Sequence, residues 1–221
     1  MLEQIRGGMV VSCQALPDEP LHSSFIMGRM ALAAKMGGAV GIRAQGREDI
    51  LEIQKVVDLP VIGIVKRNYV DSDIYITPTK KEVDELLETG CEMIALDATK
   101  RNRPGGEKLS ELIRYIKEHH VQVMADCSTY EEACAAAELG ADCISTTLCG
   151  YTPYSEQISG PNYDLITRLA ADLDIPVIAE GKINSPEELR EVFQRNCYAA
   201  VVGGAITRPQ TITARFVDAL A

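Results

Sequence analysis

Seven short apolar runs of the chain end in a polar or charged residue. In chain order these residues are Gln14, Arg43, Lys66, Asp97, Asp126, Thr147 and Glu180. A lysine can act as a proton-transfer base once its pKa falls toward neutrality, and a carboxyl group can exchange protons with the same ligand. Apolar strands also end where solvent begins, so a polar residue at the end of a run need not have a function. This explanation is sufficient for Asp97 and Thr147.

Lys66 and Glu180 are the strongest candidates for catalysis. Lys66 ends the run PVIGIVK at 60–66, where burial and a neighbouring arginine would lower its pKa enough for it to remove a weakly acidic C–H proton. A structural ion pair with Glu180 or Asp126 explains this lysine equally well. Glu180 lies inside the run PVIAEG at 176–181, where a desolvated carboxylate requires a cationic partner or a chemical role.

Two glycine-containing turns near the end of the chain are typical of phosphate binding. Gly203 and Gly204 follow an apolar run and precede Arg208 and the expected start of a helix, and Gly181 and Lys182 follow Glu180. Glycine lets backbone N–H groups approach an anion, and a helix N-terminus adds partial positive charge. One Gly-Gly pair is often only a tight turn, but two such sites at consecutive run ends predict a phosphate site.

Metal binding is not indicated. The chain has three histidines, His22, His119 and His120, and none of them ends an apolar run. Asp97 and Asp126 could hold a hard cation such as Mg²⁺, but they could equally bind substrate hydroxyl groups. We therefore expect neither a metal nor a cofactor.

The elements that must position these residues alternate regularly along the chain. Segments with helix-capping signals, such as Thr79 with Glu82 and Ser185 followed by Pro186, separate the apolar runs. Eight such repeats predict a (β/α)8 barrel, in which chemistry lies at the carboxyl ends of the strands. An open doubly wound sheet is the alternative, although no G-x-G-x-x-G follows the first run. The predicted strands are 9–15, 39–44, 60–66, 93–98, 122–127, 143–148, 176–182 and 199–206.

Length, charge and cysteine content limit the class of protein. The 221 residues fit one domain spanning 1–221, with 46% hydrophobic residues and a net charge of −10. That charge argues against a nucleic-acid partner. Neither a signal peptide nor a run of about 18 apolar residues is visible, so we expect no membrane partner. Seven cysteines without a C-x-x-C pair indicate reduced thiols and a cytoplasmic protein.

Eight blocks of the sequence together resemble the N-acylglucosamine-6-phosphate 2-epimerases. These enzymes are isomerases that interconvert N-acetylmannosamine 6-phosphate and N-acetylglucosamine 6-phosphate in bacterial sialic-acid catabolism. The resemblance covers essentially the whole chain and implies a barrel of the ribulose-phosphate-binding type. The blocks are SCQALPDEPLHSS (12–24), IRAQG (42–46), GIVKRNY (63–69), IYITPT (74–79), IALDATKRNRP (94–104), STTLCGYTPYS (145–155), IAEGKI (178–183) and VVGGAITRP (201–209).

The resemblance also implies a role for each candidate residue. Lys66 and Glu180 would be catalytic. The side chains that line the sugar would be Gln14, Arg43, Asp126 and Arg208. The backbone groups that take the phosphate would be those of Gly181, Lys182, Gly203 and Gly204. The partner would be a phosphorylated amino sugar, and the family suggests a homodimer.

The implied chemistry is consistent with these residue types. The C2 hydrogen of a 2-acetamido sugar is acidic beside the open-chain aldehyde, and Arg43 could stabilise the oxyanion that forms when it is removed. Two bases, or one base with a rotating intermediate, both satisfy the stereochemistry. The rival functions are another phosphosugar isomerase on the same barrel, which would alter Lys66 and Glu180, and a non-catalytic phosphosugar-binding protein, which would lose the lysine.

Overall fold

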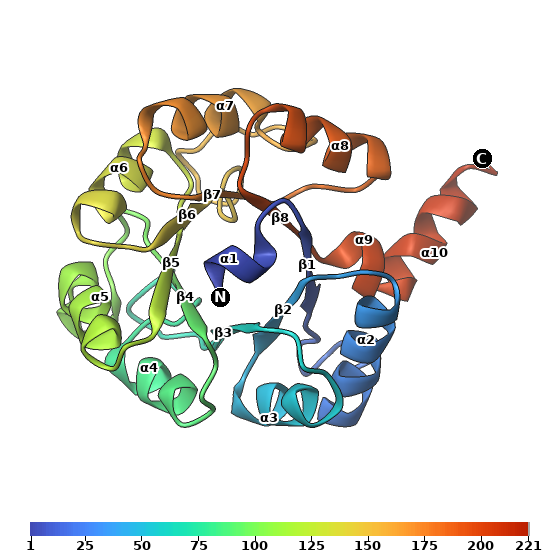
Figure 1. Ribbon diagram of the computed structural model, residues 1–221, viewed down its shortest axis with the longest axis horizontal. Coiled ribbons are helices and arrows are strands. Elements are labelled where there is room, and N and C mark those ends of the chain that lie inside the picture. Colours follow the sequence, from blue (N-terminus) through green and yellow to red (C-terminus); the bar gives the residue numbers. More distant parts are fainter. Residues whose placement is uncertain (221) are drawn as a thin grey trace.

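The eight predicted strands form one closed parallel barrel. The computed structural model of the protein describes residues 1–220, and Figure 1 shows the strands as a ring surrounded by helices. The strands are β1 (Met9–Cys13), β2 (Gly41–Gln45), β3 (Val61–Ile64), β4 (Met93–Asp97), β5 (Gln122–Asp126), β6 (Cys143–Ser145), β7 (Val177–Glu180) and β8 (Ala199–Val202). Each predicted run therefore overlaps one strand. Every strand is shorter than its run, and β2 extends one residue past its run to Gln45.

The pairing of β1 with β8 decides between the two folds that the sequence left open. Each strand pairs with its neighbour in chain order, and β1 also pairs with β8 in parallel, with Met9 opposite Ala200 and Val11 opposite Val202. An open doubly wound sheet has two free edges, whereas this sheet has none. The prediction of a (β/α)8 barrel is confirmed.

Helices cover the outside of the barrel, and several begin where the sequence predicts. Thr79 and Glu82 form a capping box at the start of α4, and Pro186 is the first residue of α8 after the capping residue Ser185. The helices are α1 (Leu2–Ile5), α2 (Ser24–Met36), α3 (Arg47–Val56), α4 (Lys80–Leu87), α5 (Leu109–Glu118), α6 (Tyr130–Glu138), α7 (Tyr163–Asp172), α8 (Pro186–Gln194), α9 (Gly204–Thr207) and α10 (Pro209–Asp218), with a 3-10 turn at Pro104–Gly106.

The two-residue period of the strands determines which side chains face the barrel interior. In β3, Ile62 and Ile64 belong to the interior core, while Val61 packs in the core between strands and helices. Lys66 follows Ile64 by two residues, so it has the inward orientation. The same alternation places Arg43, Asp126 and Glu180 inward.

One end of the barrel is closed by the start of the chain. The short helix α1 lies across the ring of strands in Figure 1, and Ile5 is fully buried in the interior core beside Val10 and Ile62. The polar strand ends lie at the opposite end of the strands. A ligand therefore has access to the barrel interior from the carboxyl ends of the strands, as is usual for this fold.

The last helix extends away from the barrel. Figure 1 shows α10 projecting past α9, and this helix has no buried residue within its span. Its apolar side chains Phe216 and Val217 are 74% and 58% exposed. No helix among residues 1–220 has the length and apolar character needed to cross a membrane.

Candidate active site

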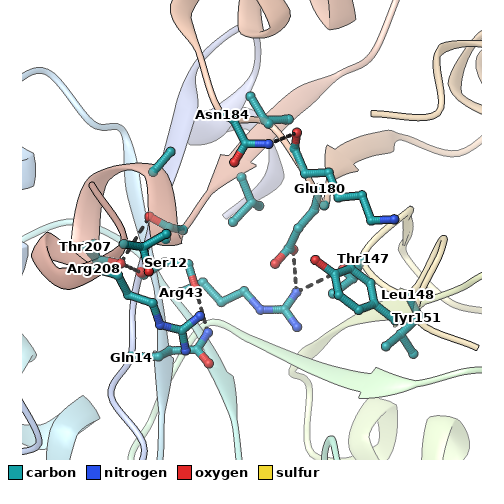
Figure 2. A pocket seen from close by; sticks show the side chains of 18 of the residues that line it. Ser12, Gln14, Arg43, Thr147, Leu148, Tyr151, Glu180, Asn184, Thr207 and Arg208 are labelled. Carbon is teal, nitrogen blue, oxygen red and sulfur yellow. Dashed lines mark hydrogen bonds and ion pairs between the residues drawn. The ribbon is translucent and has the colours of Figure 1, made fainter. Parts of the chain in front are cut away.

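A cavity of about 630 Å³ opens at the carboxyl ends of the strands. Nine of the ten residues that the sequence singled out line it. Figure 2 shows the side chains of Gln14, Arg43, Glu180 and Arg208 around this cavity. The nine are Gln14, Arg43, Lys66, Glu180, Gly181, Lys182, Gly203, Gly204 and Arg208. The tertiary structure thus gathers residues that are spread over almost the whole chain.

Arg43 lies at the centre of the polar network in this cavity. Its Nη2 donates to Asp126 Oδ2 at 2.6 Å, and its Nη1 donates to Glu180 Oε2 at 2.7 Å and to Asp126 Oδ1 at 3.0 Å. The side chain is 1% exposed. Burial lowers the pKa of Arg43, but Asp126 and Glu180 outweigh it and raise the pKa above its usual value. Two carboxyl groups therefore share one buried cation, and Figure 2 shows the contact with Glu180.

Asp126 is placed one layer deeper than the sequence analysis expected. Its side chain is fully buried behind Arg43 and does not line the cavity. Thr147, which the sequence gave no reason to select, donates to Asp126 Oδ1 at 2.7 Å and forms a 2.7 Å hydrogen bond with Ser145 Oγ. Both carboxylate oxygens of Asp126 thus accept hydrogen bonds from Arg43 or Thr147, so this carboxylate can fix Arg43 without reaching a ligand itself.

Lys66 lines the cavity as a desolvated amine. Within residues 1–220 it makes no ion pair, so the structural pair with Glu180 or Asp126 is not observed. Burial, followed by the positive charges of Arg43 and Arg208, lowers the pKa of Lys66 to about 8. Near neutral pH, Lys66 is therefore a neutral amine in part of the protein molecules. Only this form can accept a proton.

The pKa of Glu180 is shifted upward, in contrast to the lowered pKa of Lys66. Burial and the charge of Asp126 together raise the pKa of Glu180 to about 7, although the ion pair with Arg43 opposes the change. Its side chain remains 12% exposed and lines the cavity. A carboxyl group with this pKa can carry a proton at neutral pH and can also give it up.

Two buried polar atoms beside the cavity have no partner among the described residues. They are Oε1 of Gln14 and Nε of Arg43. The amide nitrogen of Gln14 is already used, since it donates to Ser12 Oγ at 2.7 Å. One acceptor and one donor therefore remain for a polar ligand, because a buried polar atom that stays unpaired costs stability.

The predicted phosphate turns lie together on one side of the cavity. Gly181 has a φ of +103°, which disfavours any residue with a Cβ, and it follows Glu180 directly. Gly203 caps the short helix α9, which begins at Gly204. The helix that the sequence analysis expected after Arg208 is α10, which begins at Pro209, and the short α9 between Gly203 and Arg208 was not expected. Amide groups at a helix start lack partners within the helix and can face an anion.

Arg208 carries a contact that the sequence analysis missed. Its Nε donates to Glu19 Oε1 at 2.6 Å and its Nη2 donates to Glu19 Oε2 at 3.0 Å. Glu19 lies in the loop between β1 and α2, at a sequence separation of 189 residues. No local pattern connects two residues so far apart, so sequence reasoning had no signal from which to find this pair.

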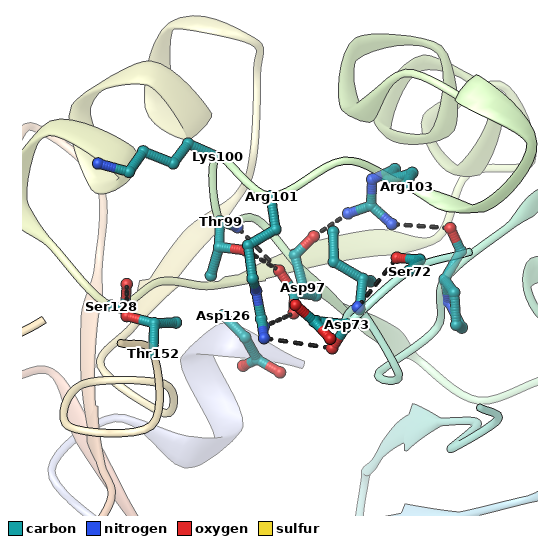
Figure 3. Close-up of polar contacts among 12 residues, drawn as sticks. Ser72, Asp73, Asp97, Thr99, Lys100, Arg101, Arg103, Asp126, Ser128 and Thr152 are labelled. Atoms are coloured by element: carbon teal, nitrogen blue, oxygen red, sulfur yellow. Dashed lines mark hydrogen bonds and ion pairs between the residues drawn. The ribbon is translucent and has the colours of Figure 1, made fainter. Parts of the chain in front are cut away.

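The second carboxylate considered for a metal is also bound to arginine. Arg101 donates to Asp97 Oδ2 at 2.6 Å, and Thr99 donates to Asp97 Oδ1 at 2.7 Å, as Figure 3 shows. Arg103 donates to the backbone carbonyl of Asp97. The structure therefore separates Asp97 and Asp126 into two arginine-bound networks. No cluster of three His, Cys, Asp or Glu side chains suited to a metal ion occurs within residues 1–220.

A closed barrel with a lysine, an arginine and a carboxyl group gathered above its strands defines an acid–base enzyme of the (β/α)8 class. A family model described as "Putative N-acetylmannosamine-6-phosphate epimerase" matches residues 27–221. The chain belongs to this family, and the resemblance seen in the sequence is confirmed.

Individual relatives agree with the family match. A Clostridioides difficile (strain 630) protein described as "Putative N-acetylmannosamine-6-phosphate 2-epimerase" is 67% identical over 220 residues, covering 100% of this chain and 99% of the relative. The solved N-acetylmannosamine-6-phosphate 2-epimerase from Clostridium perfringens has a TM-score of 0.98 at 61% identity, covering 99% of this chain and 95% of that one.

A more distant structure shares the fold alone. Thiamine phosphate pyrophosphorylase from Pyrococcus furiosus has a TM-score of 0.62 at 20% identity, covering 94% of this chain and 90% of that one. The barrel itself therefore does not specify the reaction, and the cavity residues must carry any argument about chemistry.

Proposed function

We propose that this protein is an isomerase that interconverts N-acetylmannosamine 6-phosphate and N-acetylglucosamine 6-phosphate at C2. Family membership supports the substrate. The single observation that carries the chemistry is a desolvated lysine with a pKa of about 8 that lines the same cavity as Arg43 and Glu180. A protein that only bound phosphosugars would have no use for a lysine with this perturbation.

The reaction begins with loss of the C2 proton. In the open-chain sugar, the C2–H bond lies next to the C1 aldehyde, so its electrons can pass onto the aldehyde oxygen. Neutral Lys66 accepts the proton, and an enolate forms with its negative charge on the C1 oxygen. Return of a proton to the opposite face of C2 gives the epimer. The neutral amine is the required form, which the lowered pKa supplies.

Arg43 and Glu180 act on the oxygen atoms of the sugar. The buried guanidinium stabilises the negative charge that develops on the C1 oxygen, as preorganised donors do in other enzymes. Asp126 and Thr147 hold Arg43 from behind. Glu180 contacts Arg43 through Oε2 and has a pKa of about 7, which suits a group that moves protons to and from an oxygen of the sugar.

The phosphate lies at the turns after β7 and β8. We assign it to backbone groups of Gly181, Lys182, Gly203 and Gly204, with Arg208 supplying positive charge. All five residues line the cavity, and the last two strands are where barrels of this class bind phosphate. Gln14 contributes its unpaired Oε1, which can accept a hydroxyl or amide proton of the sugar.

Proton NMR in D₂O tests the proposed function directly. Incubation of the purified protein with N-acetylmannosamine 6-phosphate should produce N-acetylglucosamine 6-phosphate and replace the C2 hydrogen with deuterium. N-acetylmannosamine without the phosphate is the control and should react far more slowly. Recovery of unchanged, fully protonated substrate would contradict the proposal.

The activity should rise with pH up to about 8. Lys66 has a lowered pKa of about 8, and only the neutral amine can act as base. Below that pH its neutral fraction, and with it kcat/KM, should fall about tenfold per pH unit. Initial rates between pH 6 and 9 check this. A profile that falls as pH rises through 8 would mean that the protonated lysine is the active form.

Arg208→Ala should chiefly weaken substrate binding. Its expected partner is the phosphate, which does not react, so KM should rise about tenfold to a hundredfold, the range for loss of a charge-assisted hydrogen bond. Some loss of kcat is compatible, because phosphate binding also positions the sugar. Steady-state kinetics check the split. A thousandfold loss in kcat with KM unchanged would contradict the phosphate assignment.

We propose that the protein is a cytoplasmic homodimer with no nucleic-acid or membrane partner. The exposed Phe216 and Val217 on α10 support the dimer, because an isolated helix that exposes apolar side chains gains stability by packing against a second copy. Light scattering should give twice the chain mass. Phe216→Asp should reduce that mass. Val70→Asp is the control, at a fully exposed apolar position outside α10, and should leave the mass unchanged. A monomeric wild-type protein would contradict the proposal.

A further inference from the structure

We propose that Glu19 is a positioning residue that holds Arg208 in the orientation required to bind the substrate phosphate. The inference rests on the proposed function, because it deepens the phosphate site assigned there. Its basis is the bidentate contact between the two side chains. The carboxylate reaches Arg208 Nε at 2.6 Å and Arg208 Nη2 at 3.0 Å.

The contact uses only one edge of the guanidinium. Nε and Nη2 face Glu19, so Nη1 is left for another acceptor. Nη1 lies beside the expected phosphate turn, 3.9 Å from the position that a Cβ on Gly204 would occupy. The Cδ atom of Arg208 lies 3.5 Å from the same position. Glu19 therefore holds Arg208 with Nη1 close to the start of α9.

Glu19 is itself fixed by its surroundings. Its Oε2 accepts a hydrogen bond from the Leu16 backbone N–H at 2.8 Å, and its Oε1 accepts one from Gln210 Nε2 at 3.2 Å. The side chain is 16% exposed, against 36% for Arg208. Although burial raises the pKa of Glu19, the hydrogen bonds from Arg208 and Leu16 outweigh it and lower the pKa overall. The carboxylate is therefore ionised and anchored.

An anchored carboxylate is useful because arginine is flexible. A free arginine side chain samples many rotamers, and holding one of them for the ligand weakens binding by about threefold to tenfold. Glu19 removes this cost before the phosphate arrives. The fork of a guanidinium also suits two acceptors at once, with a carboxylate on one edge and a phosphate on the other.

The same carboxylate acts on Lys66 through space. Four charged groups act on Lys66. Arg43 and Arg208 lower the pKa of its amine, and Glu180 and Glu19 raise it. Loss of the Glu19 charge should therefore move the acidic limb of the pH profile to lower pH. A residue that only stabilised the loop would not produce this shift.

A double-mutant cycle tests the inference. Glu19→Gln keeps the shape and an acceptor for Leu16 but loses the charge. We expect a rise of about threefold to tenfold in KM and in the inhibition constant of inorganic phosphate, with kcat unchanged. In an Arg208→Ala background the same change should have no further effect on KM, because Glu19 would act through Arg208. Asp18→Asn, an exposed carboxylate in the same loop, is the matched control and should leave both constants unchanged.

Three results would overturn the inference. The first is a Glu19→Gln variant with unchanged KM and unchanged phosphate inhibition. The second is tighter phosphate binding, since it would show that Glu19 competes with the ligand for Arg208. The third is an equal rise in KM with and without Arg208, which would indicate a general effect on the loop.

The test separates this inference from the proposed function. If the wild-type protein does not epimerise the sugar phosphate, the proposed function fails, yet calorimetry with inorganic phosphate on the same variants still measures the effect of Glu19. Failure of the wild-type protein to bind inorganic phosphate would overturn the inference as well. If epimerisation is normal and only the cycle fails, the proposed function stands without this role for Glu19.

Discussion

Replacing Lys66 with alanine should abolish both epimerisation and the uptake of solvent deuterium at C2. The side chain faces inward from the end of a buried strand, and burial gives its amine a pKa of about 8. Loss of a general base typically lowers the rate by about 10²- to 10⁴-fold. We expect the upper end because the other lysine that lines the cavity, Lys182, has its amine hydrogen-bonded to the Ile158 backbone carbonyl. Lys66→Arg should not restore activity, since a guanidinium stays protonated and cannot act as a base.

Two controls separate loss of chemistry from loss of structure. Calorimetry should show that the Lys66→Ala variant still binds inorganic phosphate, because the phosphate turns do not depend on this side chain. Lys55→Ala removes a lysine that is 69% exposed on the outer helix α3, and it should leave the rate unchanged. Near-normal deuterium uptake in Lys66→Ala would show that another group removes the C2 proton.

Glu180→Gln should reduce epimerisation and deuterium exchange at C2 together, by about 10²- to 10³-fold. The amide keeps the size of the side chain but cannot carry a proton, so it removes the group with a pKa of about 7 from the cavity. If Glu180 acts at the sugar oxygens, both processes slow in parallel, because both pass through the same enolate. A parallel loss of deuterium uptake and of epimer formation, followed by NMR, is the expected signature.

The outcome of this experiment also distinguishes the two stereochemical routes. If Glu180 is instead the second base at C2, Glu180→Gln will lose exchange from one of the two epimers and keep it from the other. Loss of exchange in Glu180→Gln together with normal exchange in Lys66→Ala would reverse the roles assigned here. Glu3→Gln, at a carboxylate that is 79% exposed on the far side of the molecule, is the control for the amide substitution.

The structural consequences of the Glu180 change should be small. Glu180 shares Arg43 with Asp126, and Asp126 retains its contacts through Nη1 and Nη2 at 3.0 and 2.6 Å. The buried arginine therefore keeps a carboxylate partner in the variant, so it is not left uncompensated. Thermal unfolding should show a Tm within a few degrees of the wild-type value, as expected when a change of about 1 kcal/mol shifts Tm by about 2–4 °C in a protein of this size.

The sequence by itself determined the barrel and the end of the strands at which its polar residues lie. Eight apolar runs separated by capped segments predicted the closed sheet, and each run overlaps an observed strand. Polar residues end these runs, and in a (β/α)8 barrel chemistry lies at the carboxyl ends of the strands. For this reason the sequence assigned Gln14, Arg43, Lys66 and Glu180 to the barrel mouth.

Only the tertiary structure decided how deep each residue lies and which charges meet. Asp126 and Glu180 both end strands and both point inward, yet Asp126 is buried behind Arg43 while Glu180 lines the cavity. The pKa values of Lys66 and Glu180 depend on that placement, because desolvation and nearby charges act through distance in space. Glu19 and Arg208 meet across 189 residues. Periodicity and capping are local properties of the chain, whereas such a contact exists only once the barrel has closed and brought its first loop beside its last turn.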